Sequence, residues 1–415
     1  MKALSLSQWQ RGLLAIAACV LLISPARTAV ADWMQQPAGT VTGADGHQHT
    51  ATCSAFPGTN PAFSFWTKQG TSKNLVVFFE GGGACWDGLT CAAPITTLPP
   101  QLPNGYFVPA VPPPPIIPAN FDGIFNLSNA ANPVKDWSFV YIPYCTGDLH
   151  LGSNTAHYVS VNSGLPFLPP PLLPPGTEFD IQHRGFDNFM VVLDWITKNF
   201  NAPKNILVTG SSGGGYGASA NFPWIQEAFP NAHMYVIADS SQGVTTDTWD
   251  QSTPGRGSWN AVLPPWVYGD DPSLVAAEDL LRISAEAYPH AKVAQVTTTF
   301  DETQILFYTL NKLFYPPGGA CPIVPIDWNQ QMLTTLKSYA TDLGNYRHYV
   351  AGGSYHMIME FPRFYTESSA GISFSKWVGA MLQSSGGTNG SGGGNWKNAA
   401  CPTCLVSPAC VLPPP

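Results

Sequence analysis

The sequence has few charged residues and few basic ones. Asp, Glu, Lys and Arg make up 11% of its 415 residues, against about a quarter in typical soluble proteins. The formal net charge is −8, so a basic surface for nucleic acid or for anionic membranes is not expected. The apolar stretch at residues 12–23 is too short to span a bilayer. With 44% hydrophobic residues, however, the chain can bury a large core as one large domain or two smaller ones.

The N-terminal 31 residues have the pattern of an export signal. Lys2 and Arg11 precede or open the apolar stretch, and small residues at 29–31 offer a cleavage site after Ala31. We therefore expect a secreted or periplasmic protein. A rival interpretation takes residues 16–19 as a lipoprotein signal with Cys19 lipidated, but the apolar stretch continues past this cysteine, which favours cleavage near Ala31.

Removal of the signal leaves an even number of cysteines. They are Cys53, Cys85, Cys91, Cys145, Cys321, Cys401, Cys404 and Cys410. In an oxidising compartment this predicts disulfides, whose pairing the sequence leaves open. Cys401 and Cys404 form a C-x-x-C pair, for which a structural bridge is favoured over zinc because no second ligand pair is near.

Apolar runs typical of buried strands occur at residues 74–80, 138–143, 205–210, 234–239, 292–297 and 347–352. Helical spacing separates them, most clearly at residues 185–200, before Pro203. Strands without polar alternation, separated by helices, predict an α/β fold with a mainly parallel sheet covered on both faces. We expect this catalytic domain at 32–383, a Gly/Ser linker at 384–396 and a Cys/Pro-rich tail at 397–415.

Two segments, 98–118 and 165–176, are rich in proline and yet apolar. Proline lacks the N–H that an interior strand needs, so both are expected to be surface loops. Either they pack over the core or they form the lips of a substrate cleft.

The stretch Gly210-Ser211-Ser212-Gly213-Gly214 follows a predicted strand and precedes a segment that can form a helix. It fits G-x-S-x-G, in which a sharp turn exposes the central serine as a nucleophile. A phosphate-binding loop would need a lysine that is absent here, and the dinucleotide pattern is matched poorly. Ser212 is therefore the predicted nucleophile.

A serine nucleophile needs an oxyanion hole and a base. Residues 81–83 are three consecutive glycines after a predicted strand, and this placement matches the loop that supplies one backbone donor. Gly82, Gly83 and Gly213 are the predicted donors. Glu80, which precedes them, is interpreted as a carboxylate that braces the loop.

Chain order predicts an acid after the serine and a histidine after the last strand. His356 lies in a Gly-rich loop just past residues 347–352, where the base is expected. Asp301 and Asp239 both end strand-like runs, and Asp301 is favoured because its run is nearer to the histidine.

The loop at residues 145–152 carries two further candidates. Asp148 and His150 are expected to border the site or to brace their loop, and Trp86 is a possible site border.

These pieces together resemble the pectin acetylesterase family, which includes the Notum-type carboxylesterases. The resemblance is to a secreted member of bacterial type. The resemblance extends from about residue 70 to 360 and rests on segments 76–86, 141–152, 183–196, 208–218 and 300–304. It implies an α/β-hydrolase-like fold and strengthens Asp301 as the acid and His356 as the base. Gly213 stands where the family usually has alanine, and Gly83-Ala84 stands where tryptophan is common, which implies a wider acyl pocket.

The resulting hypothesis is a secreted serine carboxylic-ester hydrolase that removes small acyl groups from a polymer without a metal or other cofactor. An alternative substrate is a polyester or other apolar polymer, suggested by the proline-rich loops and by Trp86 and Trp224, which are expected to be exposed. From a different class, the chain could be a non-catalytic binding module on the same fold. The oligomeric state and the acyl chain length stay open.

Overall fold

The structure is a computed structural model that describes residues 32–96, 104–112, 118–316, 324–383 and 396–401. The predicted signal, the linker, most of the tail and parts of the first proline-rich segment lie outside these residues. So do Cys321, Cys404 and Cys410. Within the described ranges, no helix is both long and apolar enough to cross a membrane.

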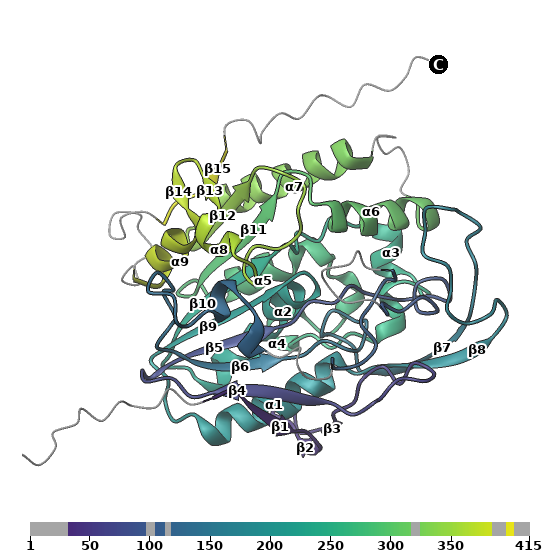
Figure 1. Cartoon of the computed structure of the whole chain (residues 1–415), viewed down its shortest axis with the longest axis horizontal. Helices are drawn as coiled ribbons and strands as arrows, with labels where there is room; N and C mark the ends of the chain where they lie inside the picture. Colours follow the sequence, from purple (N-terminus) through teal and green to yellow (C-terminus); the bar gives the residue numbers. More distant parts are fainter. Residues whose placement is uncertain (1–31, 97–103, 113–117, 317–323, 384–395, 402–415) are drawn as a thin grey trace, which may run out of the picture.

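A nine-stranded sheet forms the centre of the molecule (Figure 1). In spatial order its strands are β1 (Met34–Pro37), β4 (Ser64–Lys68), β6 (Ser138–Ile142), β5 (Asn74–Phe79), β9 (Asn205–Ser211), β10 (His233–Asp239), β11 (Lys292–Thr298), β12 (Tyr346–Ala351) and β15 (Ala399–Ala400). β4 is antiparallel to both of its neighbours, and the strands from β6 to β15 are parallel. The six strand runs expected from the sequence are all present, so a mixed α/β fold with a large, mostly parallel sheet is confirmed.

Three small antiparallel pairs accompany the sheet: β2 (Thr40–Thr42) with β3 (Gln48–Thr50), β7 (Asn154–Val159) with β8 (Glu178–His183), and β13 (Ser368–Ser369) with β14 (Ile372–Ser373). The second proline-rich segment, 165–176, joins β7 to β8 at the periphery of the molecule (Figure 1). Its Phe167 and Leu172 are exposed, whereas Leu168 is buried.

The helices are α1 (Gly185–Asn199), α2 (Gly213–Ala228), α3 (Asp247–Gln251), α4 (Pro265–Tyr268), α5 (Leu280–Ala287), α6 (Glu302–Phe314), α7 (Val324–Asp342), α8 (Arg363–Thr366) and α9 (Phe374–Gln383). Short 3-10 turns are η1 (Pro118–Asn120), η2 (Gly123–Phe125), η3 (Arg256–Trp259), η4 (Pro272–Leu274) and η5 (Ala277–Asp279). The predicted helix at 185–200 corresponds to α1.

Both faces of the sheet are covered, and strand β5 shows why its sequence is apolar at every position. Leu75 and Val77 pack into a core shared with α1, α2 and α7. Val76 and Phe78 face the opposite core, which contains side chains of α8 and α9. Because successive side chains point to opposite faces, a strand buried on both sides needs a continuous apolar run.

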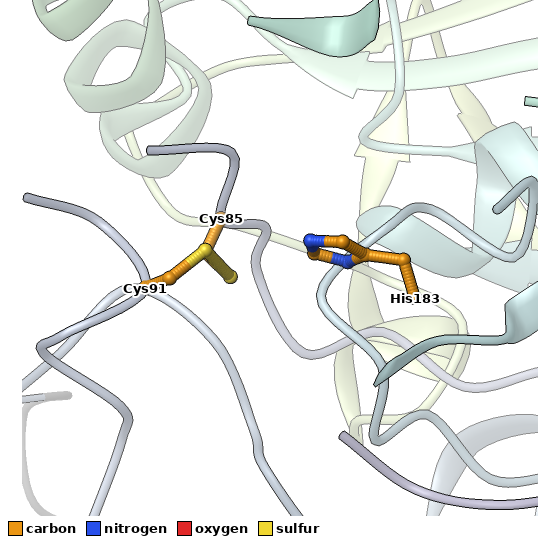
Figure 2. A group of neighbouring side chains, drawn as sticks. All are labelled: Cys85, Cys91 and His183. Carbon is orange, nitrogen blue, oxygen red and sulfur yellow. A yellow bond between two sulfur atoms is a disulfide. The ribbon is translucent and has the colours of Figure 1, made fainter. Parts of the chain in front are cut away.

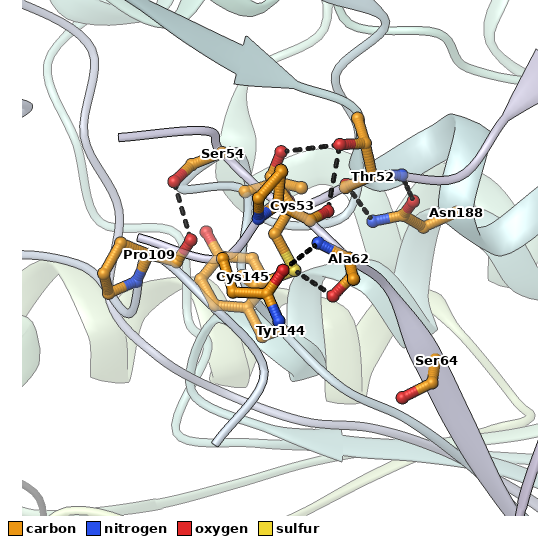
Figure 3. Close-up of a disulfide and its surroundings, with 12 residues drawn as sticks. Thr52, Cys53, Ser54, Ala62, Ser64, Pro109, Tyr144, Cys145 and Asn188 are labelled. Carbon is orange, nitrogen blue, oxygen red and sulfur yellow. Dashed lines mark hydrogen bonds between the residues drawn. A yellow bond between two sulfur atoms is a disulfide. The ribbon is translucent and has the colours of Figure 1, made fainter. Parts of the chain in front are cut away.

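Two disulfides lie among the described residues, Cys53–Cys145 and Cys85–Cys91, which confirms the expectation of disulfide bonds. Cys401 is also disulfide-bonded. Figure 3 shows Cys53–Cys145, which ties the segment before β4 to the loop after β6. The Ser54 N–H also donates to the carbonyl of Cys145 at 2.8 Å. Both links hold the loop that contains Asp148 against the N-terminal part of the domain.

Candidate active site

Ser212 occupies the sharp turn between β9 and α2. Its backbone has φ 56° and ψ −128°, a left-handed conformation that a non-glycine residue rarely adopts and that concentrates at functional sites. The side chain is 9% exposed, and the backbone N–H donates to the carbonyl of Asp239 at 2.7 Å. The serine therefore stands at a helix N-terminus, where the helix dipole favours negative charge.

The glycines around Ser212 are required by close packing of the turn. A Cβ at Gly214 would lie 2.0 Å from the carbonyl oxygen of Phe79, and one at Gly215 would lie 1.7 Å from the Ser241 hydroxyl. No larger residue fits at either position without moving β5 or the loop after β10. The G-x-S-x-G pattern thus reflects the contact of α2 with its neighbouring strands.

The glycine loop after β5 lies directly beside this turn. A Cβ at Gly81 would be 2.7 Å from the Cβ of Ser212, and one at Gly213 would be 3.2 Å from the carbonyl oxygen of Gly83. The backbone N–H groups of Gly82, Gly83 and Gly213 donate to no acceptor within the described part of the chain. Gly83 and Gly213 line one cavity with Ser212, whereas Gly82 does not, and the N–H groups of all three have no acceptor among the described residues.

Asp301 and His356 are brought together although 55 residues separate them. The Nδ1 atom of His356 lies 2.8 Å from both carboxylate oxygens of Asp301. Asp301 is fully buried and also caps α6, accepting from the N–H groups of Thr303 and Gln304. The carboxylate thereby holds the imidazole in one orientation and tautomer.

Burial by itself lowers the pKa of His356, but the charge and hydrogen bond of Asp301, together with the charges of Asp239 and Glu302, raise it by more, so the net shift is upward. The other ring nitrogen, Nε2, is buried and has no hydrogen-bond partner among the described residues. Ser212 and His356 line the same cavity. This leaves Nε2 available to a serine hydroxyl or to a bound molecule.

Asp239, the competing candidate acid, binds backbone N–H groups next to His356. Its Oδ2 atom accepts from the backbone N–H groups of Ile358 and Met359, at 2.8 and 2.9 Å, and from the Ser211 hydroxyl at 3.0 Å. Asp239 is fully buried. It therefore anchors the loop that carries His356, a role that its position at a strand end did not reveal.

The cavity beside Ser212 has about 580 Å³ of space, its open mouth included. Its lining is Gly83, Ala84, Trp86, Leu149, Ser212, Gly213, Tyr216, Ser240, Val244, Thr245, Trp249, Ala277, Thr303, Gln304, Phe307, Asn311 and His356. Trp86 is in this lining. The expectation that Trp86 and Trp224 are exposed is wrong, since their exposed fractions are 2% and 6%. Both indoles are packed against other aromatic rings inside the domain.

Asp148 and His150 lie outside this lining and are buried in their loop. The Asp148 carboxylate accepts from the N–H of Gly185 at 2.7 Å and from the Thr146 hydroxyl at 2.6 Å. The Nε2 atom of His150 lies 2.9 Å from the carbonyl oxygen of Glu80. Burial raises the pKa of Asp148 to about 6 and lowers that of His150 to about 4. Of the two expected roles, bordering the site or bracing the loop, these contacts fit the second.

Glu80 precedes the glycine loop, and its carboxylate accepts from the N–H of Tyr144 in the loop after β6 at 2.9 Å. Burial raises the pKa of Glu80 to about 7. Glu360, which sequence reasoning missed, has a pKa raised to about 8, first by burial and then by the charges of Glu80 and Asp239. The repulsion between these carboxylates places Glu360 near Glu80 and Asp239.

Cys85, Cys91 and His183 form a group of three described side chains whose potential ligand atoms all lie within 4.8 Å of one another (Figure 2). Both sulfur atoms are already joined in a disulfide. The ring nitrogens of His183 lie 2.8 Å from the Thr146 carbonyl oxygen and 2.9 Å from the Tyr158 hydroxyl. These atoms are engaged within the protein, so the group does not offer a metal site.

A model of the pectinacetylesterase family matches residues 39–255, just over half of the chain. The chain belongs to the pectin acetylesterase family. The matched region contains the glycine loop and Ser212, while Asp301 and His356 lie beyond it. Membership of this family indicates an ester-hydrolysing enzyme. A comparison with curated proteins gives no match.

Proposed function

We propose that the chain is a secreted serine ester hydrolase that removes acyl groups from a polymeric alcohol. The observation that carries this proposal is the strained Ser212 on a strand-to-helix turn, sharing one cavity with a histidine that is held by a buried aspartate. The strand order of the sheet and the position of this turn support an α/β-hydrolase-like fold. The disulfides support an oxidising compartment and thus export.

In this mechanism the Ser212 hydroxyl attacks the ester carbonyl while His356 Nε2 takes its proton. The N–H groups of Gly82, Gly83 and Gly213 stabilise the developing oxyanion. His356 then returns the proton to the leaving alcohol, and Asp301 stabilises the imidazolium throughout. Water, deprotonated by the same imidazole, releases the acid and restores the serine. Loss of one oxyanion donor typically costs about 10²- to 10³-fold in rate.

The test is hydrolysis of p-nitrophenyl acetate by the wild type and by Ser212→Ala. We expect loss of nearly all activity in Ser212→Ala, and a fluorophosphonate probe that labels the wild type but not the variant. Ser219→Ala, which removes a buried hydroxyl from α2 outside the cavity, is the matched control. Normal activity in folded Ser212→Ala refutes the assignment, and a folded wild type that neither reacts nor hydrolyses esters supports a binding module instead.

A polyester substrate remains the second candidate because four apolar side chains are exposed on and beside the β7–β8 hairpin. They are Val159, Val161, Phe167 and Leu172. Such a surface suits an apolar polymer better than a hydrated polysaccharide. Release of soluble products from a polyester film, compared with acetate release from pectin or xylan, distinguishes the two substrates.

A further inference from the structure

The cavity beside Ser212 follows one face of helix α6. Thr303 and Gln304, Phe307 and Asn311 recur at intervals of three or four residues and all line it. At 1.5 Å per residue, the eight steps from Thr303 to Asn311 extend roughly 12 Å along the helix axis. Thr303 lies next to Asp301 and so to His356, whereas Asn311 is two turns away. The cavity is therefore considerably longer than an acetyl group.

The walls of this cavity are largely aromatic. The rings of Trp86 and Trp249 meet edge to face with centroids 5.1 Å apart, and the Phe307 ring lies 6.1 Å from that of Trp86. Ala84, beside these rings, leaves space where a larger residue would fill it. Aromatic walls of this kind bind a flat apolar body.

Asn311 is one of several polar residues in this lining. It is 2% exposed, and its side-chain amide makes no hydrogen bond to any residue that the structure describes. Its neighbours differ: the Gln304 amide donates to Gln242 and Asp301, and the Thr245 hydroxyl donates to Asp250. The amide atoms are not closed off from the cavity, so they are available to a polar group of a bound molecule.

We propose that Asn311 is a specificity residue that binds a hydroxyl at the far end of the acyl group. The preferred acyl group then has an apolar, preferably aromatic, body that packs between Trp86, Trp249 and Phe307. An acetyl group would reach neither the rings nor the amide. This inference rests on the proposed ester hydrolysis at Ser212. The cavity is assigned to the acyl part of the ester because a polymeric alcohol is too large for it.

The test compares ethyl 4-hydroxycinnamate with ethyl cinnamate, which differ only in the distal hydroxyl. A second pair, ethyl 8-hydroxyoctanoate and ethyl octanoate, distinguishes an aromatic body from an alkyl chain. We expect kcat/KM of the wild type to favour the hydroxylated member of a pair by about tenfold, because a site built to bind a hydroxyl disfavours the analogue that lacks it. In Asn311→Leu this ratio is expected to fall to about one, and Asn311→Gln, which keeps the amide, is expected to retain part of it.

A preference in either pair that disappears in Asn311→Leu supports the proposal, and the absence of any preference overturns it. So does a preference that survives in Asn311→Leu. Hydrolysis of p-nitrophenyl acetate separates this failure from failure of the proposed function, since that reaction needs Ser212 but not the far end of the cavity.

Binding gives a readout that does not depend on turnover. In Ser212→Ala, calorimetry is expected to show 4-hydroxycinnamate binding about tenfold more tightly than cinnamate, and equal binding overturns the proposal.

Discussion

The loop that carries His356 is held by Asp239, and removal of this carboxylate should damage catalysis without touching the cavity. In Asp239→Ala, the N–H groups of Ile358 and Met359 lose their acceptor at 2.8 and 2.9 Å. A buried group left unpaired costs about 1–3 kcal/mol. Two such groups predict a loss of roughly 2–6 kcal/mol in the free energy of unfolding. Water that enters the site and accepts from these N–H groups would reduce this loss.

The catalytic effect follows from the position of His356. A displacement of about 1 Å in a catalytic group can lower the rate about 100-fold. We therefore expect kcat of Asp239→Ala for p-nitrophenyl acetate to fall by about this factor, with little change in KM, since Asp239 is not among the residues that line the cavity.

Asp239→Asn is the matched variant, because its amide oxygen can still accept from both backbone N–H groups. It should retain much of the kcat that Asp239→Ala loses, and thermal melts should rank the stabilities in the same order. Steady-state kinetics on folded protein provide the assay. A kcat for Asp239→Ala within about threefold of wild type, well short of the 100-fold expected from a displaced base, would refute the anchoring role.

Three further predictions concern the same site. Asp301→Asn removes the charge that raises the pKa of His356, so we expect kcat to fall about 10⁴-fold and the acidic limb of the pH–rate profile to move to lower pH; an unmoved limb contradicts this. Gly83 has φ +75°, and a Cβ there would lie 1.9 Å from the Tyr106 carbonyl oxygen, whereas the closest contact of a Cβ at Gly213 is 3.2 Å; Gly83→Ala should thus lose about 10²-fold in kcat and Gly213→Ala much less, as p-nitrophenyl acetate assays would measure. The pKa of Glu360 is raised from 4.5 to about 8, so the folded state binds this proton more tightly and the free energy of unfolding should fall as pH rises from about 4.5 to 8. In Glu360→Gln the free energy of unfolding, measured by denaturation at several pH values, should depend less on pH over this range, and an unchanged pH dependence would count against the prediction.

Much of the local structure could be predicted from the sequence. The run at residues 205–210 is apolar because β9 is buried on both faces, and the glycines after it are required because α2 begins against two neighbouring strands. Helix α1 follows from apolar residues at helical spacing. These signals are local, since each depends on side chains a few residues apart.

Contacts between distant segments could not be read in this way. Asp239 and Asp301 both end parallel strands, and neither periodicity nor spacing shows which carboxylate meets the histidine. Only the path of the loop after β12 brings His356 to Asp301 and the following N–H groups to Asp239. The exposure expected for Trp86 and Trp224 failed for the same reason, because burial of an aromatic ring depends on elements far away in the chain.

The sequence by itself thus determined the strands, the helix after Ser212 and the glycine turn, because apolar periodicity and missing side chains act over a few residues. The tertiary structure decided which acid holds the histidine and how deep the cavity extends along α6. It also decided that the Asn311 amide faces this cavity with no hydrogen-bond partner among the residues described. These features arise where β5, β9, β11, β12 and α6 converge, and the packing of the sheet sets their geometry.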